Sequence, residues 1–156
     1  MRKLISFLFF ALFLTGNIWA GTPKESLRAL SHGEPIAISS EKMTLKGQED
    51  KVFFEGDVLI QKGDIKITAG RVEVQLANRE NVKEIVQIAM LDEVEVKQGD
   101  RRVLAQKGVY NTKEGEIVLT GDAEMWEKGY HVKGRLIRLS LNQKRSFVEG
   151  SVLTIY

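Results

Sequence analysis

Apolar and polar residues alternate with a period of two along most of the chain that follows Pro35. Ile36 and Ile38 begin the pattern, and short clusters of Gly, Asp and Asn interrupt it as far as the C-terminus. Because successive side chains of a strand point to opposite faces of a sheet, the pattern predicts strands with one apolar and one polar face. Many such strands in series, separated by turn residues, predict an all-β fold.

The apolar faces predict one continuous interior, while the opposite face, which carries Lys66 and Glu73, should meet solvent. We expect this interior to consist of Ile36, Ile38, Met43, Leu45, Val52, Phe54, Val58, Ile60, Ile65, Ile67, Val72, Val74, Val94, Val96, Val103, Ile117, Leu119, Met125, Val132, Ile137 and Leu139, with Ala105 and Ala123.

One short phrase of sequence repeats along the predicted strands. Phe54-Glu55-Gly56-Asp57-Val58 returns at 119–123 and 148–152 and, more weakly, at 90–94, so the copies lie 29 to 36 residues apart. Such a period indicates stacked strand units that share one interior. We interpret Asp57 and Asp122 as turn residues. Small residues at similar offsets should mark strand corners or close backbone approaches, at Ala69, Ala105 and Gly134. An ordinary antiparallel sandwich with glycine turns is the alternative.

The N-terminal segment resembles a secretory signal peptide. Arg2 and Lys3 precede an apolar run from Leu4 to Leu14, and the small residue Ala20 would suit a signal peptidase. We predict cleavage after Ala20, with a retained membrane anchor as the alternative. Residues 21–34 should form an N-terminal segment with a possible short helix, since Thr22, Pro23 and Glu25 have capping-box spacing. The β-domain should cover residues 35–156.

Charge and composition narrow the possible functions. The chain has 23 Lys+Arg and 21 Asp+Glu, and the two basic residues of the signal segment account for the difference. No basic block remains that would bind nucleic acid. We interpret Arg101 and Arg102, beside Asp100, as solvated turn residues. The absence of cysteine excludes a thiol nucleophile and a thiolate zinc site.

No group of residues has the pattern of an active site, and we expect no catalytic residues, no metal and no cofactor. His32 and His131, the two histidines, do not have metal-ligand spacing and should lie at the surface. Trp126 and Tyr130 flank a predicted turn, where they could form an aromatic rim for a ligand or simply pack.

The repeated strands resemble the family of lipopolysaccharide-transport periplasmic proteins, the LptA or OstA-like family. The resemblance is closest over Pro35-Ile-Ala-Ile-Ser-Ser, over 52–69 and over 117–123, and it continues to the end of the chain. It implies a half-open, twisted, V-shaped β-jellyroll (β-taco) whose interior holds the acyl chains of lipid A. It also implies end-to-end self-association in the periplasm, bridging an inner-membrane partner to an outer-membrane partner.

Two hypotheses of different classes follow. The first is a lipid conduit in which the apolar interior is the lipid-binding groove, since exposure of acyl chains to water costs about 0.8 kcal/mol per methylene. The second is a structural or assembly module, with a membrane-anchored relative of the same transport system as a further option. Unpaired edges should support assembly through strand addition at Ile36, Ile38, Val152, Leu153, Thr154 and Ile155. A C-terminal strand that folds back and pairs internally is the alternative.

Overall fold

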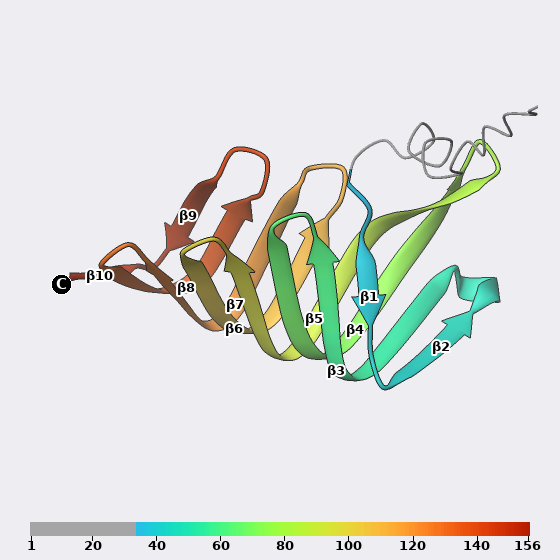
Figure 1. Ribbon diagram of the computed structural model, residues 1–156, viewed down its shortest axis with the longest axis horizontal. Coiled ribbons are helices and arrows are strands. Elements are labelled where there is room, and N and C mark those ends of the chain that lie inside the picture. Colours follow the sequence, from blue (N-terminus) through green and yellow to red (C-terminus); the bar gives the residue numbers. More distant parts are fainter. Residues whose placement is uncertain (1–33) are drawn as a thin grey trace, which may run out of the picture. The chain divides into compact units, whose positions relative to one another are not determined.

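The computed structural model describes residues 34–156, which form one antiparallel sheet with a single 3-10 turn at Gly47–Glu49 (Figure 1). The predicted signal peptide and the predicted helix lie outside the described residues. No helix within the described range is long and apolar enough to cross a membrane. The strands are β1 (Ala37–Ser39), β2 (Lys42–Lys46), β3 (Lys51–Lys62), β4 (Ile65–Arg79), β5 (Val82–Gln98), β6 (Arg101–Asn111), β7 (Glu116–Glu127), β8 (Tyr130–Ser140), β9 (Arg145–Glu149) and β10 (Val152–Ile155).

The strands follow one another across the sheet almost in sequence order, from β1 and β2 at one edge to β9 and β10 at the other. β1 and β2 pair with the two halves of β3, so together they act as one strand interrupted at 40–41. β9 and β10 pair in the same way with the two halves of β8. Within residues 34–156 the two edges do not pair with each other, so the sheet is open. This confirms the predicted all-β, half-open architecture.

Each long strand bends near its middle, and the bends lie side by side in one line (Figure 1). In β3 the bend falls at Gly56 and Asp57, where φ is 79° and 44° and the register with β4 shifts. Gly121 and Asp122 make the equivalent bend in β7, with φ of 81° and 49°. The prediction that Asp57 and Asp122 lie in turns is therefore wrong. The repeated phrase marks corners inside continuous strands, where an extra residue bends the backbone as in a β-bulge.

The intervening strands bend at smaller residues. Register shifts lie at Ala69 and Gly70 in β4, after Leu104 in β6 and around Gly134 in β8. None of these bends has positive φ. Space at Gly70 is tight, because a Cβ there would lie 3.0 Å from the Cβ of Asp92 on β5. The predicted role of small residues at corners is confirmed at these positions.

The corners divide the sheet into two walls, each ending in a row of hairpin turns (Figure 1). The first wall ends at the turns 63–64, 99–100 and 128–129, which we call the first rim. The second wall ends at the turns 47–50, 80–81, 112–115 and 141–144, which we call the second rim. The core lies between the walls, and the side opposite the corners, where the rims face each other, is called the mouth.

Candidate functional site: the apolar interior between two walls

The interior is built from the alternating side chains of both walls, as the period of two predicts. Val58 and Val94 come from the first wall, Ile117 and Leu119 come from the second, and each has 0% exposure. Directly paired residues share a face, so rows such as Ile60–Ile67–Val96–Val103–Met125–Val132 cross the sheet from strand to strand. The predicted interior residues that are buried are Val58, Ile60, Ile65, Ile67, Val72, Val74, Val94, Val96, Val103, Ala105, Ile117, Leu119, Ala123, Met125, Val132, Ile137 and Leu139.

The remaining predicted interior residues lie toward the N-terminal edge. Ile36, Ile38, Val52 and Phe54 are partly buried against the core. Met43 and Leu45 pair with Phe54 and Val52, so they face the interior side, yet they are 63% and 64% exposed. They lie on the predicted interior face but stay exposed, because β2 is an edge strand with no neighbour beyond it. The C-terminal edge is similar, since Leu153 pairs with Val132 and remains 58% exposed.

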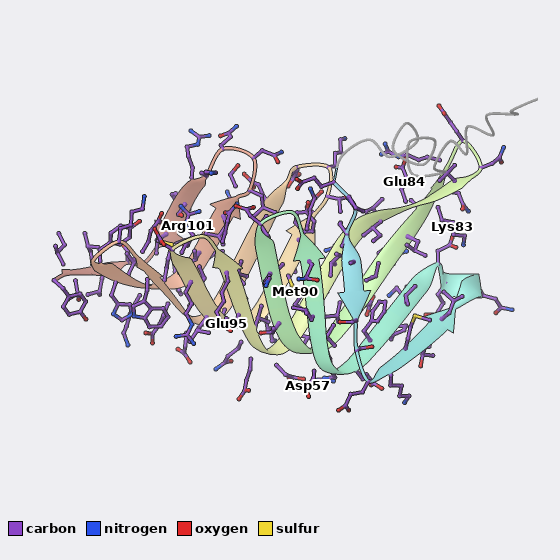
Figure 2. All side chains as sticks on the ribbon, in the orientation of Figure 1. Asp57, Lys83, Glu84, Met90, Glu95 and Arg101 are labelled. Atoms are coloured by element: carbon purple, nitrogen blue, oxygen red, sulfur yellow. The ribbon has the colours of Figure 1, made fainter. Side chains whose placement is uncertain are left out.

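Four interior residues were missed by the sequence analysis: Ile88, Met90, Tyr110 and Leu141 are all buried. Ile88 and Met90 alternate with Ala89 in the sequence, which was a usable signal. Met90 lies between the walls, whereas Asp57 lies on the corner line (Figure 2). Burial raises the pKa of the Tyr110 hydroxyl, so this group stays a neutral phenol in the interior.

Arg101 is also placed in the interior, at its boundary with the first rim. Both residues lie in β6 rather than in a turn. The prediction of solvation is wrong for Arg101, whose side chain is 9% exposed, and holds for the neighbouring Arg102, whose side chain is 51% exposed. Nε of Arg101 donates to Oε2 of Glu127 over 3.0 Å. The Tyr130 hydroxyl donates to the same Oε2 over 2.7 Å. Alternation explains the difference, because Arg101 shares its face with Val103 while Arg102 points outward.

Ionisation in this cluster follows from its hydrogen bonds. Burial alone would raise the pKa of Glu127, but the bonds from Arg101 and Tyr130 outweigh it and lower that pKa. The hydrogen bond to Glu127 raises the pKa of Tyr130. Glu127 is therefore held as a carboxylate and Arg101 as its counter-ion.

The outer face of the first wall carries a ladder of polar and aromatic side chains. Trp126 and His131 stack with ring centroids 4.6 Å apart, and the Arg102 guanidinium lies 5.6 Å from the centroid of the Trp126 ring. Nε2 of His131 lies 2.8 Å from Oε2 of Glu124. The His131 side chain is only 12% exposed, so the expectation of a surface histidine is only partly met. Trp126 and Tyr130 lie on opposite faces, so they do not form a shared aromatic rim.

Two hollows open along the corner line, and charged residues contribute to the lining of both. Arg71, Asp92 and Lys107 line the first, and Asp122 and Lys133 contribute to the second. No group of three or more His, Cys, Asp or Glu residues in the described range is arranged to hold a metal ion. The continuous apolar surface is therefore the interior rather than these hollows.

Comparisons with known proteins agree with this architecture. The family model of the LptA/(LptD N-terminal domain) LPS transport protein matches residues 37–154. The lipopolysaccharide export system protein LptA of Escherichia coli (strain K12) is 28% identical over 120 residues, covering 72% of this chain and 63% of that protein. An uncharacterized protein of Rhizobium meliloti (strain 1021) is 29% identical over 108 residues, covering 66% of this chain and 58% of its own length. The chain thus spans about three fifths of these curated relatives.

Among solved structures, the crystal structure of LptH from Pseudomonas aeruginosa is similar to this chain, with a TM-score of 0.69. LptH is described as the LptA homologous periplasmic component of the conserved lipopolysaccharide transport device. The match covers 79% of this chain and 96% of LptH at 13% sequence identity. At that identity the likeness shows a shared fold.

Proposed function

Because this chain belongs to the LptA/LptD N-terminal family of LPS transport proteins, we propose that it carries lipopolysaccharide from the inner to the outer membrane. A transport family agrees with the expectation that the chain is not an enzyme. The observation that supports the proposal most strongly is the continuous apolar interior of the open sheet. This interior extends across the sheet from β1 to β10. The compartment would be the periplasm, with inner-membrane and outer-membrane transport components as partners.

The interior can take up acyl chains only if the two walls move apart. Residues such as Ile88, Leu119 and Ile137 have 0% exposure, so the side chains of the two walls already fill the space between them. The walls share a backbone only at the corners, and both sheet edges are unpaired. Acyl chains would replace contacts between the walls with contacts to lipid, and would gain about 0.8 kcal/mol for each methylene taken out of water.

A second candidate, a structural or assembly module, is favoured by the same close packing. An interior filled by its own side chains needs no ligand for stability. The two candidates differ in what the purified protein contains, because only a conduit should carry lipid.

Assembly would extend the interior from one copy to the next. β9 and β10 run from the second rim to the first, and β1 and β2 run from the first rim to the second. A second copy could therefore pair its β1 and β2 antiparallel with β10 and β9 of the first copy. The corner at 40–41 of the second copy would then lie beside the corner at 150–151 of the first. Backbone hydrogen bonds would supply affinity by strand addition. Leu153 and Ile155 of one copy would then lie beside Ile38 and Ile36 of the next, on the interior face of the first wall.

Mass spectrometry of organic extracts tests the proposed cargo. Protein purified from its own periplasm should yield lipid A species at a fixed ratio to protein. Protein unfolded and refolded in lipid-free buffer before extraction should yield none, which controls for contamination. Extracts that contain no lipid A from either sample would contradict the conduit and favour the structural module.

A further inference from the structure

Arg101 is the one buried charged residue of the described part of the chain, at 8% exposure. It begins β6 at the first rim and lies on the interior row that joins Ile65, Gln98, Arg101, Glu127 and Tyr130 across the first wall. A guanidinium loses much of its hydration when it is buried, so it persists there only with charged or polar partners. The partners of Arg101 therefore indicate what the residue does.

Two of the three hydrogen bonds of Arg101 hold its side chain against the first wall, to which Arg101 itself belongs. Nε donates to Oε2 of Glu127 over 3.0 Å, and Nη2 donates to Oε1 over 3.3 Å, so the pairing is bidentate. The Tyr130 hydroxyl holds the same carboxylate from the next strand. A planar fork bound at two points has a defined orientation. The guanidinium is thus aimed by β7 and β8 of the first wall.

The third hydrogen bond of Arg101 crosses to the other wall. Nη2 also donates to the backbone carbonyl of Lys144 over 3.3 Å. Lys144 lies in the turn between β8 and β9, on the second rim, and has φ of 50°. All other hydrogen bonds found between residues at the rims of the region 34–156 stay within one rim, as between Gln98 and Asp64 or between Leu141 and Gly115. The two rims are therefore tied together at this one position.

We propose that Arg101 is a clasp that holds the mouth closed over the C-terminal part of the interior, by joining the first rim to the carbonyl of Lys144 on the second. The N-terminal part, over β3 to β5, has no such tie among the described residues. The mouth would therefore open more easily there than at β6 to β9. The clasp itself is independent of any cargo.

Its role in transport rests on the proposed function. A lipid whose acyl chains lie between the walls keeps its sugar headgroup outside, so the mouth must part wherever the headgroup passes. Moving toward β10 would bring the lipid to the clasp, and the bond from Arg101 to Lys144 would have to break. Arg101 would then control entry to the last strands, next to the edge at which another copy is expected to join.

Distances between the rims test the clasp directly. The chain has no cysteine, so the substitutions Asp100→Cys and Gln143→Cys allow one nitroxide label on each rim of the full mature chain. Without lipid, double electron–electron resonance should give a narrow distribution of distances between the two labels when Arg101 is present. Arg101→Met keeps an unbranched side chain and removes the guanidinium with all three of its hydrogen bonds, so the distribution of distances should broaden and shift to longer distance.

Arg102→Gln is the matched control, because it removes a neighbouring guanidinium that lies on the outer face beside Trp126. It should leave the distribution unchanged, and circular dichroism should show that both variants are folded. Equal distributions for Arg101 and Arg101→Met would overturn the clasp.

A second arm with lipid A addresses gating and separates it from the proposed function. Binding is first established by photocrosslinking at Phe54, away from the clasp. In the chain that retains Arg101, bound lipid A should broaden the distribution of distances between the labels and shift it to longer distance, as Arg101→Met does without lipid. Lipid A that crosslinks while the rims keep their lipid-free distance would overturn the gating role alone. A failure to crosslink would contradict the proposed function and leave the lipid-free comparison as the test of the clasp.

Discussion

At the scale of single residues, the corners depend on backbone conformations that few residues adopt. Gly121 has φ of 81°, and Asp92 and Glu93 in β5 have φ of 65° and 54°. Non-glycine residues pay a steric cost in this region, which Asp and Asn tolerate best. Asp92 is further held by an ion pair with Arg71 of β4. The corner line is therefore maintained by glycine where space is tight and by an acidic residue where a partner is near.

Gly121→Ala should destabilise the fold more than Gly99→Ala does. Both glycines have positive φ, so both variants carry the left-handed strain of about 1 kcal/mol. A Cβ at Gly121 would lie 2.7 Å from the Cβ of Gln106, whereas a Cβ at Gly99 has nothing within 4 Å. Overpacking adds about 1–3 kcal/mol. Urea unfolding of both variants measures the difference, and equal free energies of unfolding would show that the corner tolerates a side chain.

Glu127→Gln should lower stability at neutral pH and reduce its dependence on pH. The pKa of Glu127 is lowered in the folded chain, so its contribution is fully present above the ordinary glutamate pKa of about 4.3. That contribution is lost as pH falls through the folded-state pKa. We expect a loss of about 2 kcal/mol, less than for a fully buried pair, because the Glu127 side chain is 19% exposed.

The measurement for Glu127 is urea unfolding from pH 7 to pH 3. The difference from the unsubstituted chain should shrink below about pH 4. Glu114→Gln, in the exposed turn 112–115, is the control and should change stability by less than about 0.5 kcal/mol. A difference that stays constant over the whole pH range would show that the charge of Glu127 does not contribute.

At the scale of elements, two kinds of corner alternate along the sheet and decide what the sequence could reveal. In β3, β5 and β7, the last interior residue before the corner and the first one after it are four positions apart in sequence. In β3 these two residues are Phe54 and Val58. In β4 the two interior residues that flank the corner, Ala69 and Val72, are three positions apart. The interior residues of β4 therefore have odd numbers before the corner and even numbers after it. The period of two predicts the face within each half-strand. It does not by itself predict where the face changes.

The faces of the half-strands were therefore predictable, while several particular residues were not. The corner of β5 at Asp92 and Glu93 has no glycine, so the repeated phrase is weakest there, and Ile88 and Met90 were not assigned to the interior. Arg101 was missed because it follows a turn and its neighbour Arg102 is solvated. Its burial depends on Glu127 and Lys144, which are distant in sequence and come close only when the sheet bends.

Ile155→Pro should weaken end-to-end assembly while leaving the single copy folded. The Tyr156 N–H donates to the carbonyl of Gly129, toward β8. N–H groups alternate between the two edges of a strand, so that of Ile155 points to the free edge. Proline there removes a donor that only a second copy would use. By the same alternation Val152→Pro would break pairing with β8, which makes it an unsuitable test.

Ile155→Ala is the matched control, since it removes the same side chain and keeps the N–H group. Sedimentation velocity at rising concentration should show assembly of the unsubstituted chain, little for Ile155→Pro and an intermediate amount for Ile155→Ala. An unsubstituted chain that stays monomeric, or a proline variant that assembles as well as the alanine variant, would contradict strand addition at this edge.

At the scale of the whole molecule, transport between two membranes requires a chain that is exported and released. The predicted signal peptide, residues 1–20, lies outside the described residues and stays a prediction. Intact mass of the protein recovered from the periplasm should correspond to a chain that begins at Gly21. A mass that includes residues 1–20 would contradict cleavage and favour the membrane-anchored alternative.

The central claim is that acyl chains occupy the space between the two walls, and photocrosslinking tests it most directly. Ile67 and Lys66 are adjacent in β4 and point to opposite faces, with Ile67 4% exposed and Lys66 on the solvent side. A photoreactive residue at Ile67 or at Leu119 of the second wall should capture lipopolysaccharide in cells. The same residue at Lys66 or Glu73 should capture none, whereas equal capture at both sets of positions would contradict the account.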